Sequence, residues 1–237
     1  MNCSVCQSVL RPVEKVTNCI LQHPQCFPSY QEQPRADISL FQCYGCGHYA
    51  IQPLPLEEIY EDYEMDAFQA SNPATAAKLA DKIAHLASLA PDTSSLLEIG
   101  CGNGHALRLA RSKFASGTGV DPSAPPDPRD DPSLCFLRDY FDASTPVPQD
   151  FSAFMSHQVF QHLENPLETL QAVYNVLQPG GVGLINVPDG GKIMEEKLYH
   201  QILAEHVQYY TPFSLASLAR LAGFEILEIR RDPEAIE

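Results

Sequence analysis

The stretch Ser-Leu-Leu-Glu-Ile-Gly-Cys-Gly-Asn-Gly, residues 95–104, decides the fold class of this 237-residue chain. A short apolar run leads into three glycines at alternate positions, and the helix-forming sequence HALRLARSKFA of residues 105–115 follows. A strand, a glycine-rich turn and a helix in this order let the backbone approach a ligand closely at the start of the helix. The stretch therefore predicts a nucleotide-binding turn.

A second strand is expected over residues 117–120, and it ends at Asp121, 21 residues beyond Gly100. An acidic residue at the tip of the second strand accepts hydrogen bonds from ribose hydroxyls in nucleotide-binding sheets. The strand, the turn, the helix and the acid together indicate a nucleotide-binding site much more specifically than a glycine-rich turn alone.

The remaining chain continues the alternation of strands and helices. Further strands are expected over 133–137, 151–155, 182–187 and 224–230, and helices over 73–90, from Asn165 to the Pro-Gly-Gly of 179–181, and over 212–221. Seven prolines in residues 121–148 disfavour a regular helix after the second strand. The pattern predicts an α/β fold with a doubly wound, mostly parallel sheet that binds ligands at the carboxyl ends of its strands.

Charge and hydropathy narrow the function. The chain has 15 Lys and Arg against 30 Asp and Glu, a formal charge of −15. Nucleic-acid binders gain affinity by neutralising phosphates, so RNA or DNA is disfavoured and a small-molecule substrate is expected. No apolar run is long enough for a membrane helix or a signal peptide, which favours a cytoplasmic protein without a membrane partner.

Eight cysteines are present, six of them in the first 46 residues. Cys3 and Cys6 form one Cys-x-x-Cys pair, and Cys43 and Cys46 form another. In a cytosolic chain two such pairs indicate a tetrahedral zinc site, structural because four thiolates leave no position for water. Buried thiols without metal are the alternative. Four other residues could replace a ligand or bind a second ion: Cys19, His23, Cys26 and His48.

Charge also divides the chain. Residues 1–52 carry balanced charges, so the net negative charge lies downstream. We therefore expect a zinc-binding segment over 1–52, a helical linker over 53–92 with an acidic helix at 56–70, and the nucleotide-binding domain over 93–237.

The motif Glu98-Ile-Gly-Cys-Gly-Asn-Gly104 resembles motif I of class I S-adenosylmethionine-dependent methyltransferases. The resemblance extends through Val120-Asp-Pro-Ser123, through residues 158–166 and through Leu177-Gln-Pro-Gly-Gly181. It implies a Rossmann-like fold and S-adenosylmethionine as cofactor. The cofactor-binding residues implied by the resemblance are Glu98, Gly100, Gly102, Gly104, Asp121, Pro122, Asp139, Tyr140 and His157. Ordinary packing would also explain Tyr140 and His157, and a solvated strand end would explain Asp139.

A narrower resemblance joins the two ends of the chain. The paired cysteines, the run Ile-Tyr-Glu-Asp-Tyr at 59–63 and the run Glu-His-Val-Gln-Tyr-Tyr at 205–210 are similar to the zinc-containing C-methyltransferases of deoxysugar biosynthesis. It implies that His206 is the catalytic base beside Glu205, that His162 helps bind or polarise the substrate, and that Tyr63 contacts substrate or cofactor. The chain departs from that family at Leu203, where a tyrosine is expected, and it ends after the expected sixth strand, without the family's C-terminal domain. The sheet then lacks its antiparallel edge strand, or the chain is a shorter relative with another acceptor.

Carbon methylation removes a proton α to a carbonyl, and imidazole titrates near neutral pH, which suits it to that task. Two alternatives stay open at this stage. One is an RNA methyltransferase that uses the zinc segment to grip RNA, and the other is a cofactor-binding scaffold without catalysis. The sequence leaves the acceptor and the oligomeric state undetermined.

Overall fold

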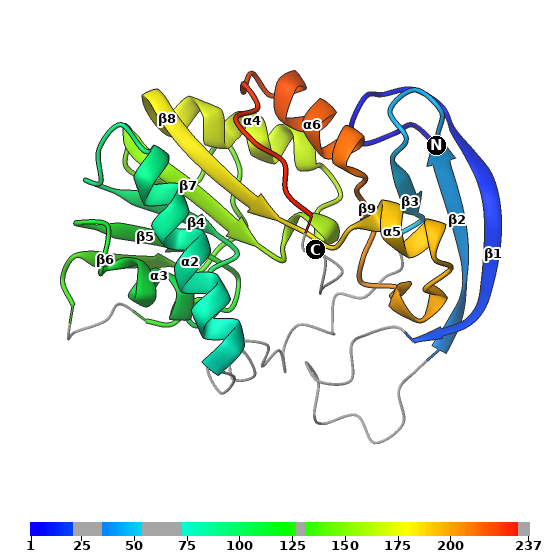
Figure 1. Cartoon of the computed structure of the whole chain (residues 1–237), viewed down its shortest axis with the longest axis horizontal. Helices are drawn as coiled ribbons and strands as arrows, with labels where there is room; N and C mark the ends of the chain where they lie inside the picture. The colour runs from blue at the N-terminus through cyan, green and yellow to red at the C-terminus, as the bar shows by residue number, and fades with distance from the viewer. Residues whose placement is uncertain (21–34, 54–72, 127–130, 232–237) are drawn as a thin grey trace. The chain divides into compact units, whose positions relative to one another are not determined.

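The computed structural model describes residues 1–20, 35–53, 73–126 and 131–231 (Figure 1). The chain forms two compact units. Unit 1 comprises Met1–Ile59, Gln158–Gln171 and Asn186–Glu237, and unit 2 comprises Tyr60–His157 and Ala172–Ile185. The predicted segments 1–52, 53–92 and 93–237 group the chain differently and stay a prediction. The expected helix at 56–70, with Tyr63, lies outside the described residues.

Unit 2 is built on a five-stranded sheet in the order β6-β5-β4-β7-β8. Its strands are β4 (Leu96–Ile99), β5 (Gly117–Val120), β6 (Leu134–Leu137), β7 (Phe151–His157) and β8 (Leu177–Asn186). β4 pairs in parallel with β5 and β7, and β5 pairs in parallel with β6. The predicted doubly wound α/β fold is confirmed. β8 begins directly after the preceding helix, earlier than the expected start at Val182.

Helices α2 (Pro73–Leu89) and α3 (His105–Ala110) pack against this sheet. The apolar stripe predicted for α2 is buried, with Leu79, Ile83 and Leu86 each at most 3% exposed. α3 is shorter than the predicted 105–115, because the chain turns after Ala110 to bury Phe114 and enter β5. Between β5 and β6 the described residues form no helix, as the prolines predict.

Unit 1 contains a second sheet, in the order β1-β2-β3-β9, with every neighbouring pair antiparallel. Its strands are β1 (Leu10–Ile20), β2 (Arg35–Cys43), β3 (Tyr49–Ile51) and β9 (Gln208–Tyr209). β1 and β2 run as a long curved pair, blue in Figure 1. Because β9 pairs with β3, residues 208–209 join the N-terminal cysteine segment in one structure.

The other helices within the described residues are short. They are η2 (Phe160–His162), α4 (Pro166–Val176), α5 (Gly190–Glu195), η3 (Tyr199–Gln201) and α6 (Pro212–Leu221). α6 has the predicted bounds, and Thr211 and Ser214 form a capping box at its start.

The predicted strand at 224–230 is wrong, because these residues have no regular secondary structure. Leu227 is 66% exposed and Ile229 is 44% exposed. The alternation of apolar residues here suits a strand, but alternation alone does not supply the neighbouring strand that a sheet needs. The described part of the sheet accordingly ends at β8.

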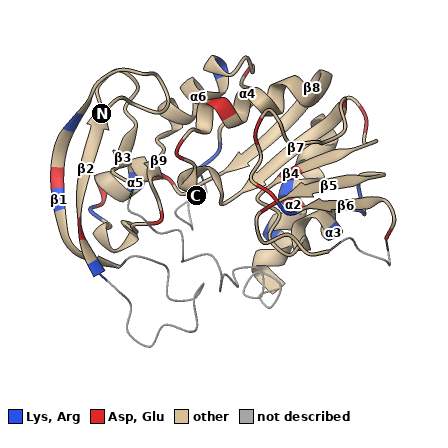
Figure 2. Cartoon of the chain, turned by 180° about the vertical axis from the view of Figure 1, so that it is seen from behind, with Lys and Arg blue, Asp and Glu red and all other residues tan. Residues whose placement is uncertain are grey.

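The charged residues of the described part are dispersed. Figure 2 shows Lys and Arg scattered along both units and interleaved with Asp and Glu. Among the described residues, no helix combines the length and the apolar character that a membrane crossing requires.

Candidate functional site

The glycine-rich turn of unit 2 follows β4. Gly100, Gly102 and Gly104 have φ values of 75°, 47° and 81°, in the left-handed region where glycine is favoured. Gly100 donates its N–H to the Val120 carbonyl at 2.8 Å, which ties the turn to the end of β5. At Gly104 a Cβ atom would collide with the ring of Phe136. The backbone conformation therefore favours glycine at all three positions. At Gly104 a side chain would also clash with Phe136.

Asp121 lies directly after β5 and is bonded to this turn. Its Oδ2 accepts the Gly102 N–H at 3.0 Å, and its Oδ1 accepts the N–H and Oγ–H of Ser123 at 2.7 and 2.6 Å. A carboxylate oxygen has two lone pairs, so Oδ2 can accept a ribose hydroxyl in addition to the turn amide. The backbone thus holds the carboxylate in place for a ligand that lies over the turn.

The other predicted cofactor residues are distributed along the same unit. Glu98 lies within β4 and is 2% exposed. Asp139 follows β6 and accepts the N–H of Tyr140, whose side chain is 70% exposed. His157 ends β7, and its Nε2 lies 3.5 Å from Nζ of Lys82 on α2.

Pro122, the remaining predicted cofactor residue, is exposed beside Asp121. Since the paired strands are parallel, Gly100, Asp121, Asp139 and His157 lie toward the carboxyl ends of neighbouring strands, where nucleotide sites form. Carboxylates beside a glycine-rich turn fit a cofactor that combines a cationic sulfonium, an ammonium group and a ribose diol.

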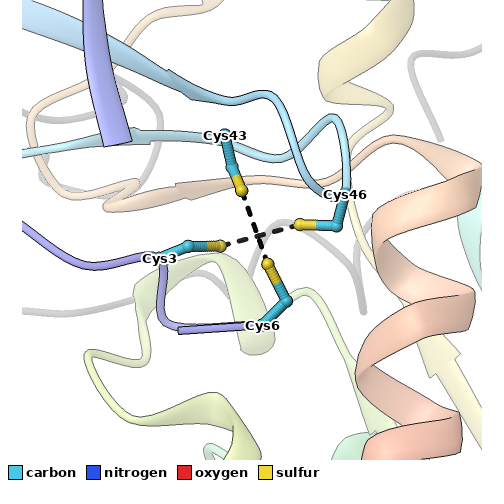
Figure 3. A group of neighbouring side chains, drawn as sticks. All are labelled: Cys3, Cys6, Cys43 and Cys46. Carbon is cyan, nitrogen blue, oxygen red and sulfur yellow. Dashed lines mark hydrogen bonds between the residues drawn. The ribbon is translucent and has the colours of Figure 1, made fainter. Parts of the chain in front are cut away.

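Four cysteines of unit 1 form a second cluster (Figure 3). The Sγ atoms of Cys3 and Cys46 are 3.6 Å apart, those of Cys6 and Cys43 are 3.4 Å apart, and all four lie within 4.8 Å of one another. Figure 3 shows the sulfurs converging from two turns on one point. Four sulfurs about 2.3 Å from a tetrahedral zinc would be separated by about 3.8 Å, close to this spacing.

Within the cluster the thiolate form is favoured at Cys3 and disfavoured at Cys43, whose pKa is raised by burial, and at Cys46. A hydrogen bond from Cys46 and backbone N–H groups of Cys6 and Val5 lower the pKa of Cys3 to about 4, against the opposing effect of burial. The pKa of Cys46 is raised, chiefly because it holds the proton of that bond. A bound divalent cation would take the place of such shared protons.

The alternative metal ligands have other contacts. Cys19 packs in the unit 1 core and its Sγ donates to the Val16 carbonyl. His48 is fully buried, and its Nε2 lies 2.7 Å from Oε1 of Gln208. Within the described ranges neither residue belongs to the group of four cysteines that could bind a metal ion. His23 and Cys26 lie outside the described residues.

Unit 1 also brings His162 and His206 together. Their ring centroids are 4.8 Å apart in an edge-to-face arrangement. Nδ1 of His162 lies 2.9 Å from the Glu205 carbonyl oxygen, and because a carbonyl can only accept, Nδ1 carries the proton. Desolvation lowers the pKa of His162 to about 4, so at neutral pH the ring is uncharged and Nε2 has a lone pair.

Tyr209 holds the turn that presents Glu205 and His206. Its hydroxyl accepts the Leu203 N–H at 3.0 Å and donates to the Leu203 carbonyl at 2.9 Å. Glu205 is 4% exposed. Sequence reasoning assigned no supporting role to Tyr209, to Gln208 or to Tyr210, whose hydroxyl donates to the Phe160 carbonyl at 3.2 Å. The one feature that could have indicated this role is that they are polar residues in the run 205–210, which also contains His206.

The sheet order, the glycine-rich turn after β4 and the acid after β5 define a class I S-adenosylmethionine-dependent methyltransferase. The model of a methyltransferase domain family matches residues 71–229, well over half of the chain. The chain belongs to this family and is an S-adenosylmethionine-dependent methyltransferase.

Solved structures share this fold. One is a chain in the complex between the Haloferax volcanii Trm112 methyltransferase activator and a methyltransferase, at 21% identity and a TM-score of 0.51, over 70% of this chain and 78% of that chain. Another is the cyclopropane synthase MmaA2 from Mycobacterium tuberculosis, at 18% identity and a TM-score of 0.52, over 65% of this chain and 62% of that one. No curated protein matches the chain significantly.

Proposed function

We propose that this methyltransferase acts on a small-molecule acceptor at a carbon α to a carbonyl, with His206 as the general base. The observation that carries the proposal is the His162–His206 pair, held at 4.8 Å beside the buried Glu205. Unit 2 would bind S-adenosylmethionine through Asp121 and the glycine-rich turn, and the cofactor supplies the methyl group. Tyr63 stays a proposed contact of substrate or cofactor.

The two histidines would have different roles. An imidazole that titrates near neutrality suits proton abstraction from carbon, and a buried carboxylate close to it in the chain would stabilise the imidazolium that forms. His162 is neutral, and because Nδ1 carries its proton, its Nε2 accepts a hydrogen bond from Nε2 of Gln161 at 3.3 Å. A hydroxyl of the acceptor would replace this amide as the donor to Nε2, and that bond would orient the acceptor. Such positioning accounts for much of the rate of group transfer between bound reactants.

We also propose that Cys3, Cys6, Cys43 and Cys46 hold one structural zinc. The sulfur spacing and the burial of three of the four support it. A site with four protein thiolates would stabilise unit 1 and leave methyl transfer to other residues. A zinc site of this kind also fits a reducing, cytoplasmic environment, where thiols stay reduced and can bind a metal ion.

A small acceptor is favoured over RNA by charge. The chain carries −15, and the Lys and Arg residues of the described part are dispersed (Figure 2). An RNA methyltransferase would need a concentrated basic surface to gain phosphate affinity. Salt-dependent retention of total RNA by the purified protein would favour RNA as the acceptor.

The experiment follows proton removal and methylation separately, with a panel of keto-acids and ketosugar nucleotides in D₂O. Wild-type protein should exchange the α-proton of the true acceptor and, with S-adenosylmethionine, form a new carbon–methyl bond. His206→Ala should lower both rates by about 10²–10⁴-fold while cofactor affinity stays within twofold.

The control is His200→Ala, which removes an exposed histidine of η3 and should leave both rates unchanged. If His206→Ala keeps wild-type turnover, the base is another residue. A product methylated on oxygen or nitrogen would contradict the carbon assignment.

A further inference from the structure

The buried amide of Gln208 joins two parts of unit 1 that the proposed function treats separately. Gln208 lies in β9 and is 5% exposed. Its Nε2 donates to the Leu163 carbonyl at 2.8 Å. Since a carbonyl can only accept, this bond fixes the orientation of the amide, and Oε1 faces the opposite way as an acceptor.

Oε1 of Gln208 receives two hydrogen bonds from the cysteine site. Oγ of Ser4, between Cys3 and Cys6, donates at 2.7 Å, and Nε2 of His48 is also at 2.7 Å and must donate because Oε1 accepts. The carbonyl of His48 in turn accepts the N–H of Cys43 at 2.8 Å. Both cysteine turns therefore meet at one side-chain oxygen.

The other end of the amide supports the turn that carries His162. Leu163 directly follows His162, and its N–H donates to the Phe160 carbonyl to close η2. The Gln208 backbone belongs to the segment that presents Glu205 and His206. One side chain thus ties the backbone of the His162 turn to the segment of His206.

We propose that Gln208 is a positioning residue that aligns the His162–His206 pair from the cysteine site. The inference rests on the proposed catalytic role of the pair. A disturbance of the Cys3–Cys6 turn then reaches His162 through the amide of Gln208, because a buried amide that loses a partner repacks to satisfy its remaining groups. The cysteine cluster would then contribute to catalysis through the position of His162.

The test is a double-mutant cycle between Ser4→Ala and Gln208→Met on the full chain, with metal content checked for each variant. Methionine keeps the length of the side chain and removes its hydrogen bonds. The readout is the nuclear magnetic resonance signal of the His162 ring, both the Nδ1 proton and the Hε1 proton. Ser4→Ala should move these signals in the wild-type background and move them less than one third as far in the Gln208→Met background.

A matched control is Ser214→Ala, which removes a buried hydrogen-bonding hydroxyl from the capping box of α6 in the same unit. It should leave the His162 signals in place. Equal shifts on Ser4→Ala in both backgrounds would overturn the proposal. So would unchanged His162 signals in Ser4→Ala alone, and this single variant decides the matter even if Gln208→Met does not fold.

The kinetic readout separates this inference from the proposed function. Gln208→Met should lower kcat at least tenfold and leave the KM for S-adenosylmethionine within twofold, a split that Ser214→Ala should not show. If His206→Ala retains full turnover while the cycle still shows coupling to His162, the proposed function fails and the positioning contact stands. If His206→Ala is inactive but the cycle shows no coupling, only the positioning role is wrong.

Discussion

The cofactor turn of unit 2 and the cysteine–histidine region of unit 1 are assembled in opposite ways. In unit 2, Gly102 and Asp121 belong to consecutive strand ends, and one hydrogen bond of 3.0 Å joins them. In unit 1, Ser4, His48, Leu163 and Gln208 come from four separated segments and meet at one amide. Parallel strands bring neighbouring sequence motifs to one edge, whereas the unit 1 site depends on long-range pairing and on its cysteines.

The largest effect expected from this contrast is on the cysteine site. Cys43→Ser should abolish binding of about one zinc per chain and unfold unit 1, since structural zinc contributes about 10–16 kcal/mol of binding free energy in small sites. The Asp121–Gly102 contact lies wholly in unit 2, so affinity for S-adenosylmethionine should stay within about threefold. Elemental analysis, thermal unfolding and calorimetry measure the three quantities.

The exposed Cys135 provides the control, because Cys135→Ser should keep both zinc and unfolding temperature. A Cys43→Ser protein that binds zinc as the wild type does would refute the metal site. Loss of cofactor affinity together with zinc would show that the two regions do not form independently.

The next effect compares a glycine from each region. Gly104→Ala must adopt φ of 81° and push against the Phe136 ring, costing about 1–2 kcal/mol for conformation and about 1–3 kcal/mol for overpacking. Gly45→Ala in the cysteine turn is closest to the hydroxyl oxygen of Ser8, at 2.9 Å, which can rotate away, and its contacts with Cβ of Ser8 at 3.4 Å and Sγ of Cys43 at 3.6 Å are ordinary. Urea unfolding should show the larger loss at Gly104, and an equal loss at both positions would contradict the packing described for the cofactor turn.

The third effect is the dependence of the free energy of unfolding on pH. The pKa of His162 is lowered to about 4, below its ordinary value of about 6.5, so the unfolded chain binds this proton first as pH falls. The neutral ring therefore costs no stability above about pH 6.5, and the free energy of unfolding decreases as pH falls from there toward 4, by on the order of 3 kcal/mol. His162→Gln should flatten this part of the pH dependence, measured by urea unfolding. An unchanged slope would mean that the ring is not desolvated.

The sequence predicted unit 2 well for a physical reason. The strand at 117–120 and the apolar stripe of α2 depend on local patterns, and both are found. The strand at 224–230 failed because a strand needs a neighbour that local alternation does not specify. The four-stranded sheet of unit 1 was not predicted, since β9 has only two residues and is defined by its pairing with β3.

The same distinction between local patterns and long-range contacts applies to the candidate site. Paired cysteines and a glycine-rich turn carry their chemistry in short spacings, so the sequence was enough to single them out. The supporting contact of Gln208 with Leu163 spans 45 positions and has no local pattern that could predict it. The roles of His206, Glu205, His162 and Tyr63 stay predictions that the kinetic experiments test.

The most direct measurement is a calorimetric titration of S-adenosylmethionine into the wild type, Asp121→Ala and the control Asp81→Ala, which removes an exposed acid on α2. Loss of a hydrogen bond to a charged group costs about 1.5–3 kcal/mol, so Asp121→Ala should bind at least about tenfold more weakly, while Asp81→Ala binds as the wild type does. Equal affinity of all three proteins would contradict the assignment of Asp121 and the adjoining glycine-rich turn as the cofactor site.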